Sequence, residues 1–234
     1  MKIFVMMPTY NESQNIRSII ESVLKLKIND LEIAVVDDNS PDSTWKIVEE
    51  ISKNNNKVHL LLRKKDKGRG SAGKDGFIYC LKKGADYIIE MDADFSHNPQ
   101  YIPKMLEEMK NCDVVLGSRI KEGGMDTRKS ILRRAITKLA NIYIRVVLGL
   151  NVKDCNSGFR CFKRAALMGI NPEKLESKGP SIVQEVLFKI HLNGFKINEI
   201  PIVFNERKRG KSKLGIRQIV SGYITVLKLR FFSK

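Results

Sequence analysis

The sequence predicts an α/β fold with a mainly parallel central sheet flanked by helices, followed by a C-terminal amphipathic helix. The first observation is that short β-branched runs alternate with helical patterns over the first half of the chain. The second is that polar, glycine or proline turns separate these segments. The third is the 42% content of hydrophobic residues, which is enough for a full core in a chain of 234 residues.

The first half of the chain contains the strands and helices of the expected sheet. The strands are expected at 2–6, 32–36, 58–62, 87–91 and 113–116. The helices between them are expected at 12–25, 43–52, 71–83 and 99–109. In a sheet of this kind ligands bind outside the carboxyl ends of the strands, so the residues that follow each strand are the first candidates for a site.

The second half is less regular. A basic helix is expected at 129–148, a polar turn at 154–160 that leads into a short strand, and a helix at 180–192. A strand at 196–204 and an amphipathic helix at 214–232 complete the chain. Since no linker, internal repeat or low-complexity tract separates these elements, a single domain spanning 1–234 is expected.

The chain is strongly basic, because 42 Lys and Arg outnumber 26 Asp and Glu and give a formal net charge of +16. Such an excess indicates an anionic partner: a nucleic acid, a membrane surface or a phosphorylated substrate. The four cysteines are scattered without a Cys-X-X-Cys pair, so reduced thiols in a cytosolic compartment are expected. Neither a signal peptide nor a run of about 18 apolar residues is found, which argues for a cytoplasmic protein without a membrane span.

Acidic side chains follow the expected strand at 87–91, where the sequence reads Asp92-Ala93-Asp94. Two carboxylates one residue apart suit a hard cation such as Mg²⁺, which prefers oxygen ligands and keeps substrate phosphates in its shell. The alternative is a turn with two solvated carboxylates. Three other strand ends carry acidic, tyrosine, glycine or basic residues, at 8–12, 37–41 and 63–76. All four ends together indicate a nucleotide-phosphate site.

The glycine-rich stretch after the third strand matches two known motifs imperfectly. Residues 68–73 fit G-x-G-x-x-G, but about five mostly charged residues separate them from the strand, whereas a dinucleotide fingerprint follows its strand directly. Residues 68–74 resemble a P-loop, but Asp75 stands where a Ser or Thr would bind Mg²⁺. We therefore expect a flexible basic loop that meets phosphate or base, rather than a site for NAD or ATP.

A series of blocks occurs in the order typical of one enzyme family. They are Pro-Thr-Tyr-Asn-Glu at 8–12, Asp-Asp-Asn-Ser-Pro-Asp at 37–42, Asp-Ala-Asp-Phe-Ser-His at 92–97, Gly-Ser-Arg at 117–119, Ser-Gly-Phe-Arg at 157–160 and Arg-Lys-Arg-Gly-Lys-Ser-Lys-Leu at 207–214. With these blocks the chain resembles the dolichyl-phosphate mannose synthase branch of the family 2 glycosyltransferases over nearly its whole length. The resemblance implies a GT-A (Rossmann-like) fold and transfer, with inversion, of a sugar from a nucleotide donor to a polyprenyl or dolichyl phosphate. It also implies a nucleotide-binding half at 1–120 and an acceptor-binding half at 121–234.

The resemblance further implies roles for single residues in binding the donor. Around the nucleoside it places Pro8, Tyr10, Glu12, Val36 and Asp38. Asp92 and Asp94 would hold Mg²⁺ or Mn²⁺ on the diphosphate, with Ala93 against the ribose. Some relatives have a metal-binding Gln where this chain has Ser96, so Ser96 is expected to be a third but weaker ligand.

For the donor and acceptor phosphates the resemblance points to Arg119, Arg133, Arg207 and Lys213. An inverting transfer builds negative charge on the leaving nucleoside diphosphate, and a bound metal and positioned cations stabilise that charge. An acceptor phosphate is already anionic near pH 7, so a strong general base is not obligatory. The cations must instead screen the repulsion between two anions.

Three further residues have two readings each. Glu185 stands where other members of the family carry a catalytic base, and the alternative is an ion pair that positions an arginine. Asp154 is expected either to bind the acceptor or a sugar hydroxyl, or to cap a turn. His97, before Asn-Pro, is expected to be a satisfied turn residue rather than a base.

The expected helix at 214–232 is both apolar and basic, and its longest uncharged run, at 218–227, is too short to cross a bilayer. Such a helix either lies in the membrane interface, where anionic lipid attracts it, or packs on the core. Residues 129–150 offer a second surface of the same kind. Because a polyprenyl tail stays in the bilayer, we expect at least one of the two to touch the cytoplasmic face of a membrane. Many relatives carry a membrane-spanning tail, so a membrane-anchoring partner subunit is a further expectation.

The expected function is therefore metal-dependent transfer of a sugar to a polyprenyl phosphate, with GDP-mannose as the leading donor. A UDP-glucose or UDP-N-acetylhexosamine donor is the alternative within this class. A basic nucleic-acid-binding protein is the alternative of a different class. It is disfavoured, and no nucleic-acid partner is expected, because the chain has no recognisable reading helix and its strand-end acids would repel a phosphate backbone.

Overall fold

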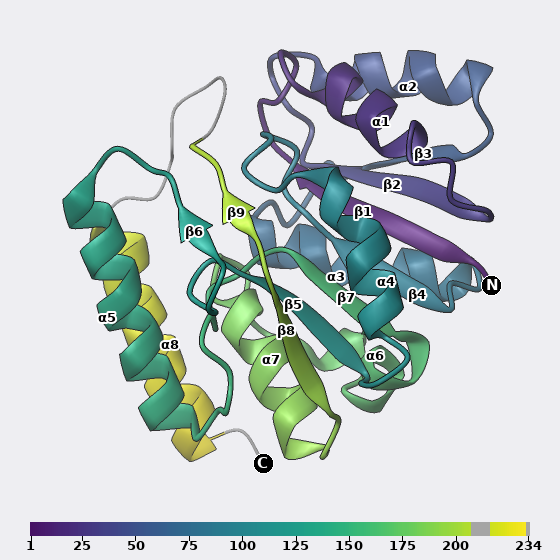
Figure 1. Cartoon of the computed structure of the whole chain (residues 1–234). Coiled ribbons are helices and arrows are strands. Elements are labelled where there is room, and N and C mark those ends of the chain that lie inside the picture. Colours follow the sequence, from purple (N-terminus) through teal and green to yellow (C-terminus); the bar gives the residue numbers. More distant parts are fainter. Residues whose placement is uncertain (207–215, 233–234) are drawn as a thin grey trace.

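The computed structural model describes residues 1–206 and 216–232 of the chain, which form three layers with a sheet between two sets of helices (Figure 1). The sheet has seven strands in the order β3-β2-β1-β4-β7-β5-β8, and β6 pairs with β9 beside it. The predicted α/β class, with a mainly parallel central sheet flanked by helices, is confirmed. Strands from both sides of residue 120 enter the one sheet, while the division of the chain into two functional halves stays a prediction.

The elements follow the predicted order closely. The strands are β1 (Ile3–Thr9), β2 (Leu31–Asp37), β3 (Val58–Leu62), β4 (Tyr87–Glu90), β5 (Val114–Ser118), β6 (Met125–Asp126), β7 (Arg160–Lys163), β8 (Ile197–Pro201) and β9 (Val203–Phe204). The α-helices are α1 (Ile16–Leu24), α2 (Thr44–Asn54), α3 (Arg69–Lys82), α4 (Ile102–Glu108), α5 (Ile131–Leu148), α6 (Arg164–Gly169), α7 (Ile182–Leu192) and α8 (Ile216–Phe232). Two short 3-10 helices are η1 (Pro99–Tyr101) and η2 (Pro172–Lys174). The start of the helix expected at 214–232 lies outside the described residues.

Three features of the fold differ from the prediction. β7 runs antiparallel between β4 and β5, although the chain reaches it long after both. The strand expected at 196–204 is two strands, because β8 joins the large sheet whereas β9 pairs with β6. The short elements β6 and α6 were not predicted, since two to six residues carry too little pattern to distinguish them from a turn.

Both faces of the sheet are buried, which explains why its central strands read as continuous apolar runs. In β1, Phe4 and Met6 belong to one core cluster, while Ile3 and Val5 belong to the cluster on the opposite face. The first cluster lies under α3, α6 and α7, and the second under α1, α2 and α4. With both faces covered, a ligand can reach the sheet at the ends of its strands.

The glycine-rich stretch is helical from Arg69 onward, two residues before the helix expected at 71–83, so the flexible loop expected at 68–74 is wrong beyond Gly68. The glycines serve close packing of α3. A Cβ on Gly76 would lie 2.8 Å from the Met6 side chain of β1, and one on Gly70 would lie 2.0 Å from the Ser177 carbonyl oxygen. Glycine therefore lets this helix approach both the sheet and the loop at 177–179, at some cost in helix propensity.

Candidate functional site

The acidic motif stands at the carboxyl end of β4, as predicted, with its two carboxylates in different environments. The Asp92 side chain is 38% exposed, whereas Asp94 is 5% exposed. Ser96 holds Asp94, because its backbone N–H and its hydroxyl donate to Asp94 Oδ1 over 3.0 and 2.6 Å. Ala93 between them is buried. The motif thus presents one accessible carboxylate beside one that is fixed by its own turn.

This donor set fits a hard divalent cation that takes only part of its shell from the protein. Asp92 and Asp94 offer carboxylate oxygens, and in residues 1–206 and 216–232 no group of three or more His, Cys, Asp or Glu side chains forms a complete metal cage. Mg²⁺ and Mn²⁺ accept such sites, since phosphate and water supply the remaining oxygens. Ser96 orients Asp94 in this structure, and its role as a third ligand stays a prediction.

A cation that sequence reasoning did not assign to the site lies against this motif. Arg69, the first residue of α3, places Nη1 2.8 Å from Glu90 Oε1 and Nη2 3.6 Å from Asp92 Oδ1. Burial alone lowers the pKa of Arg69, but the charges of Glu90 and Asp92 outweigh burial and raise that pKa above its ordinary value. The signal was present in the glycine-rich stretch, but only the early start of α3 shows where this side chain points.

His97 is a satisfied turn residue, as expected. Its Nδ1 accepts a hydrogen bond of 3.1 Å from the backbone N–H of Asp92, and its ring stacks on Phe159 with 5.2 Å between centroids. Burial lowers the pKa of His97, although Asp92 and Asp94 oppose this shift. A neutral imidazole with Nδ1 as acceptor fixes the backbone of the acidic motif and is not arranged to act as a base at neutral pH.

The residues expected around the nucleoside lie together at the ends of β1 and β2. Pro8 pairs with Val36 across the two strands, and Tyr10 follows with its ring 41% exposed. Glu12 is buried, and its carboxylate accepts a hydrogen bond of 2.8 Å from Asn15 Nδ2.

Asp38 has partners of its own within this group of nucleoside residues. It forms a buried ion pair with Arg63 and accepts a 2.7 Å hydrogen bond from the Gly68 backbone N–H. Its carboxylate therefore ties the end of β2 to the start of α3. The contact of each of these residues with a nucleoside stays a prediction.

Arg119 and Asp154 form one unit rather than two separate ligand-binding groups. Asp154 Oδ2 accepts from Arg119 Nε over 2.8 Å and from its backbone N–H over 3.1 Å, and Oδ1 accepts from Nη2 over 3.2 Å. The guanidinium also lies over the ring of Phe204, 4.6 Å from its centroid. As placed, Asp154 is a partner of Arg119, and the expected contacts of both residues with phosphate or acceptor stay predictions.

The other expected cations fall on the second half of the chain. Arg133 is exposed on the first turn of α5. Arg207 and Lys213 lie outside the described residues. Asn205, two residues before Arg207, lies beside the acidic motif, because its backbone N–H donates to the Ser96 carbonyl oxygen over 3.1 Å.

Glu185 holds a loop through both of its carboxylate oxygens. It is 1% exposed, and its two carboxylate oxygens accept from the backbone N–H groups of Glu176 and Ser177 over 3.0 and 2.8 Å. Lys189 Nζ lies 3.0 Å from Oε1. Burial raises the pKa of Glu185, but these hydrogen bonds outweigh burial and hold it below its ordinary value. The ion pair therefore involves a lysine rather than the expected arginine, and the catalytic role of Glu185 stays a prediction.

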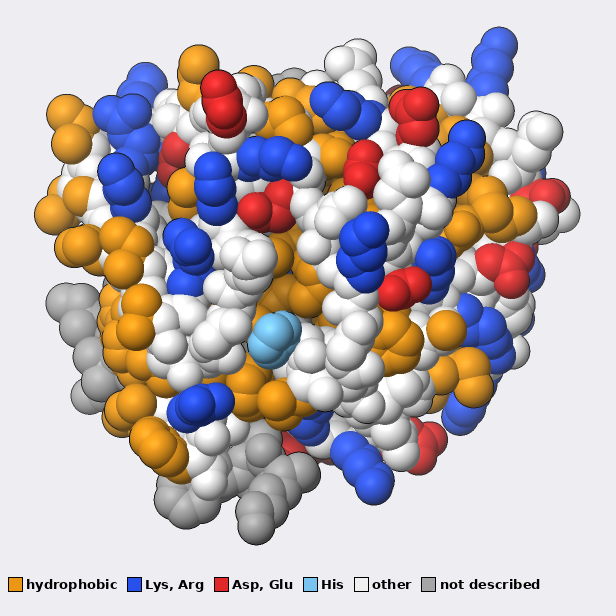
Figure 2. Space-filling view, turned by 60° about the horizontal axis from the view of Figure 1, so that its bottom comes forward, with side chains coloured by type: hydrophobic (Ala, Val, Ile, Leu, Met, Phe, Trp, Pro, Cys, Tyr) orange, Lys and Arg blue, Asp and Glu red, His pale blue; other side chains and the backbone are white. Residues whose placement is uncertain are grey.

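The helices α5 and α8 present apolar side chains to the outside. They pack together through Tyr143 and Tyr223, whose rings are 4.8 Å apart, and their sequences contain no Asp or Glu. Among the side chains of the pair that the structure describes, the exposed large apolar ones are Ile131, Leu132, Ile136, Leu139, Ile142, Val146, Ile224, Leu227 and Phe231. Figure 2 shows hydrophobic side chains gathered along the side of the molecule where α5 lies, with Lys and Arg beside them. None of the helices in residues 1–206 and 216–232 combines the length and apolarity needed to cross a bilayer.

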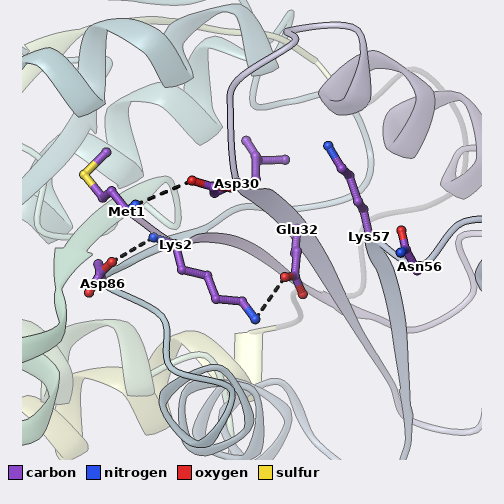
Figure 3. Close-up of a pocket in the computed structure, with 8 residues that line it drawn as sticks. Met1, Lys2, Asp30, Glu32, Asn56, Lys57 and Asp86 are labelled. Carbon is purple, nitrogen blue, oxygen red and sulfur yellow. Dashed lines mark hydrogen bonds and ion pairs between the residues drawn. The ribbon is translucent and has the colours of Figure 1, made fainter.

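A separate hollow of about 550 Å³ lies at the opposite, amino-terminal edge of the sheet (Figure 3). Several of its polar groups pair with one another: Lys2 Nζ is 2.9 Å from Glu32, and the Lys2 backbone N–H donates to Asp86 over 2.7 Å. It contains none of the strand-end residues described above. The carboxyl edge is therefore the candidate site.

Comparison with known proteins shows which family the chain resembles. The model of glycosyl transferase family 2 matches residues 4–170. Undecaprenyl-phosphate mannosyltransferase of Micrococcus luteus is 35% identical over 92% of this chain and 88% of its own length. Polyprenol monophosphomannose synthase of Mycolicibacterium smegmatis is 34% identical over 90% and 80%. Dolichol-phosphate mannosyltransferase of Pyrococcus furiosus is 36% identical over 92% of this chain but 59% of its own.

Solved structures support the fold independently. Glucosyl-3-phosphoglycerate synthase of Mycobacterium tuberculosis, in complex with Mn²⁺, UDP and phosphoglyceric acid, superposes with a TM-score of 0.69 at 18% identity. The match covers 98% of this chain and 78% of that chain, and at this identity it carries the fold alone. The expected GT-A fold is thereby confirmed, and with the family match and the curated relatives it follows that the chain belongs to glycosyltransferase family 2.

Proposed function

We propose that this enzyme transfers mannose from GDP-mannose to a polyprenyl phosphate with inversion, and that it depends on Mg²⁺ or Mn²⁺. The observation that carries the proposal is the similarity, over nine-tenths of the chain, to three enzymes named as mannosyltransferases or mannose synthases of such lipids. Family membership already separates the chain from the nucleic-acid-binding alternative. The site adds an accessible carboxylate and a fixed one at the strand end where a nucleotide is expected.

Asp92 and Asp94 are the residues that would hold the metal. When bound there, the cation supplies charge neutralisation for the departing diphosphate. The chain's own residues prepare this position: Ser96 fixes Asp94, and the His97 ring fixes the backbone N–H of Asp92. The Asp94 carboxylate, which its own turn already orients, needs no reorganisation as charge develops, and this is how preorganised groups lower a barrier.

The acceptor side requires cations rather than a base. A phosphate acceptor is anionic near pH 7, so its oxygen is already a nucleophile. The loop-holding contacts of Glu185 are consistent with a reaction that proceeds without it. We assign the acceptor phosphate to Arg207 and Lys213, on the segment that begins beside Ser96, with Arg119 and Arg133 as further cations.

The exposed face of α5 and α8 gives a route to the lipid acceptor. The apolar side chains of α5 recur every three or four residues from Leu132 to Val146, so they form one stripe along the helix. Basic residues such as Arg134 and Lys228 flank the stripe without any acid in either helix. Apolar and cationic groups together fit the interface of an anionic membrane, and we place the enzyme peripherally on the cytoplasmic face.

A donor screen on the full chain tests this function. The protein is reconstituted with vesicles that contain a polyprenyl phosphate, and transfer from GDP-mannose, UDP-glucose and UDP-N-acetylglucosamine is measured with Mn²⁺, with Mg²⁺ and with EDTA. Metal-dependent transfer of mannose alone is expected. Transfer from a UDP sugar in place of mannose would support the UDP-sugar alternative. No transfer from any donor by folded, vesicle-bound protein would refute the proposal.

A further inference from the structure

We propose that Arg69 is a resident cation of the metal site, which competes with the divalent metal for Asp92 and thereby sets the affinity for that metal. The inference rests on the metal site of the proposed function and concerns a residue that no motif of the sequence assigns to it. It predicts that this enzyme binds Mn²⁺ more weakly than its two carboxylates alone would allow.

The guanidinium of Arg69 bridges two carboxylates. Nη1 lies 2.8 Å from Oε1 of Glu90, which is 2% exposed, and Nη2 lies 3.6 Å from Oδ1 of Asp92. Among the described residues neither Arg69 Nη1 nor Glu90 Oε1 has a hydrogen-bond partner, so their attraction is that of opposite charges. A buried carboxylate with such a partner anchors the cation, because separating the two would leave an uncompensated charge in the interior.

The backbone around Arg69 is also fixed. The N–H groups of Gly68 and Gly70 donate to Asp38 and to the Lys178 carbonyl oxygen over 2.7 and 2.8 Å. The Cα of Gly158 faces the contact from the other side: a Cβ there would be 3.7 Å from both Arg69 Nη2 and Asp92 Oδ2. A cation held in this way stays in place when a metal approaches, and the more exposed Asp92 is the partner that must change.

A fully buried arginine, Arg160, shows by comparison why Arg69 is distinctive. Arg160 is fully buried, and its guanidinium donates to the carbonyl oxygens of Cys155, Ser157 and Val183, so its hydrogen bonds are satisfied by the backbone. The guanidinium of Arg69 instead faces two carboxylates, that of Glu90 in β4 and that of Asp92 in the acidic motif. A like charge within about 5 Å of an incoming divalent cation, even with strong dielectric screening, lowers the binding constant by about tenfold.

Mn²⁺ binding to the full chain in the absence of donor, measured by calorimetry or by the electron paramagnetic resonance of free Mn²⁺, tests the inference. Arg69→Gln removes the charge but keeps a polar side chain at this position, and we expect it to tighten binding by about tenfold. Arg69→Lys keeps the charge and should bind within about twofold of the wild type. Glu90→Gln leaves the Arg69 charge uncompensated and should weaken binding. Thermal unfolding of each variant shows that it is folded.

The outcomes separate this inference from the proposed function. If folded Arg69→Gln and Arg69→Lys both bind Mn²⁺ no more tightly than the wild type, the proposed competition is wrong, while the metal site itself is unaffected. If Asp92→Asn binds Mn²⁺ as well as the wild type, or if no variant binds it even with GDP present, the metal site of the proposed function fails and the competition with it. Tightening by Arg69→Gln but not by Arg69→Lys supports both.

Discussion

The first 120 residues and the α5–α8 helix pair differ in the exposure of their apolar side chains and in the pairing of their charged ones. Within 1–120 the exposed large apolar side chains are Met1 and Tyr10, and the buried acids Asp38 and Glu90 form ion pairs with Arg63 and Arg69. On α5 and α8, by contrast, apolar side chains are exposed, up to 76% at Val146, and no acid accompanies the basic residues. The first pattern suits a small anionic ligand held by fixed charges, and the second suits contact with a lipid surface.

The comparison implies that chemistry and membrane contact can be separated by substitution. A change at the acidic motif should abolish transfer without affecting binding to vesicles. A change on the α5 stripe should do the reverse. The predictions below run from the largest expected effect on transfer to the smallest.

Asp94→Ala should reduce transfer by about a thousandfold or more, because it removes the fixed carboxylate of the metal motif. The rate is measured with saturating donor and Mn²⁺, and thermal unfolding shows whether the fold is kept. Asp113→Asn is a matched control, since Asp113 forms its ion pair with Lys163 away from the motif. Wild-type turnover by Asp94→Ala would remove the metal role of this residue.

Replacing Leu139 and Ile142 together with Glu should weaken binding to anionic vesicles by at least about tenfold, because two inserted side chains are lost and negative charge is added. Both residues are exposed on α5, at 65% and 48%. The same double change at Met168 and Leu192, which are exposed at 56% and 54% on α6 and α7, is the control. Equal losses in the two double variants would show that the α5 stripe has no special role.

Glu185→Gln should lower stability by about 1–3 kcal/mol, because an amide cannot accept from both backbone N–H groups that the carboxylate holds. Transfer by the folded variant should stay within about threefold of the wild type. A loss of more than a hundredfold in turnover with unchanged stability would restore the catalytic role expected from the family resemblance.

The same residue gives a pH dependence with a defined sign. The folded-state pKa of Glu185 lies below its ordinary value of 4.5. Its stabilising contribution is therefore present above pH 4.5 and is lost as pH falls through the lowered folded-state pKa. Unfolding measured down this acid range should show a smaller loss of stability in Glu185→Gln than in the wild type.

The sequence predicted the regular part of the fold because local pattern and tertiary context agree there. The strand expected at 58–62 has the same bounds as the observed β3, and the ends of β1 and β2 carry the expected polar blocks. The insertion of β7 between β4 and β5 was not predicted, since its position is set by pairing across many residues of chain. The loop expected at 68–74 was wrong because the reason for the glycines of α3, close contact with Met6 and with the loop at 177–179, lies elsewhere in the molecule.

The candidate site divides in the same way. Asp92 and Asp94 could be predicted from their place after a strand, and His97 from its place in a turn. The pairing of Arg119 with Asp154 could not, because the partner is 35 residues away in sequence. Nor could the contact of Arg69 with Asp92, which depends on where α3 begins and how close it approaches β4.

The most direct test compares two acceptors, a long polyprenyl phosphate in vesicles and a short water-soluble prenyl phosphate, with the wild type, Asp94→Ala and the Leu139→Glu, Ile142→Glu double variant. The account predicts that Asp94→Ala loses transfer to both acceptors, whereas the double variant loses transfer to the vesicle acceptor and keeps the rate on the soluble one. Equal loss on both acceptors by a folded double variant would contradict the division of the molecule into a catalytic edge and a membrane-binding helix pair.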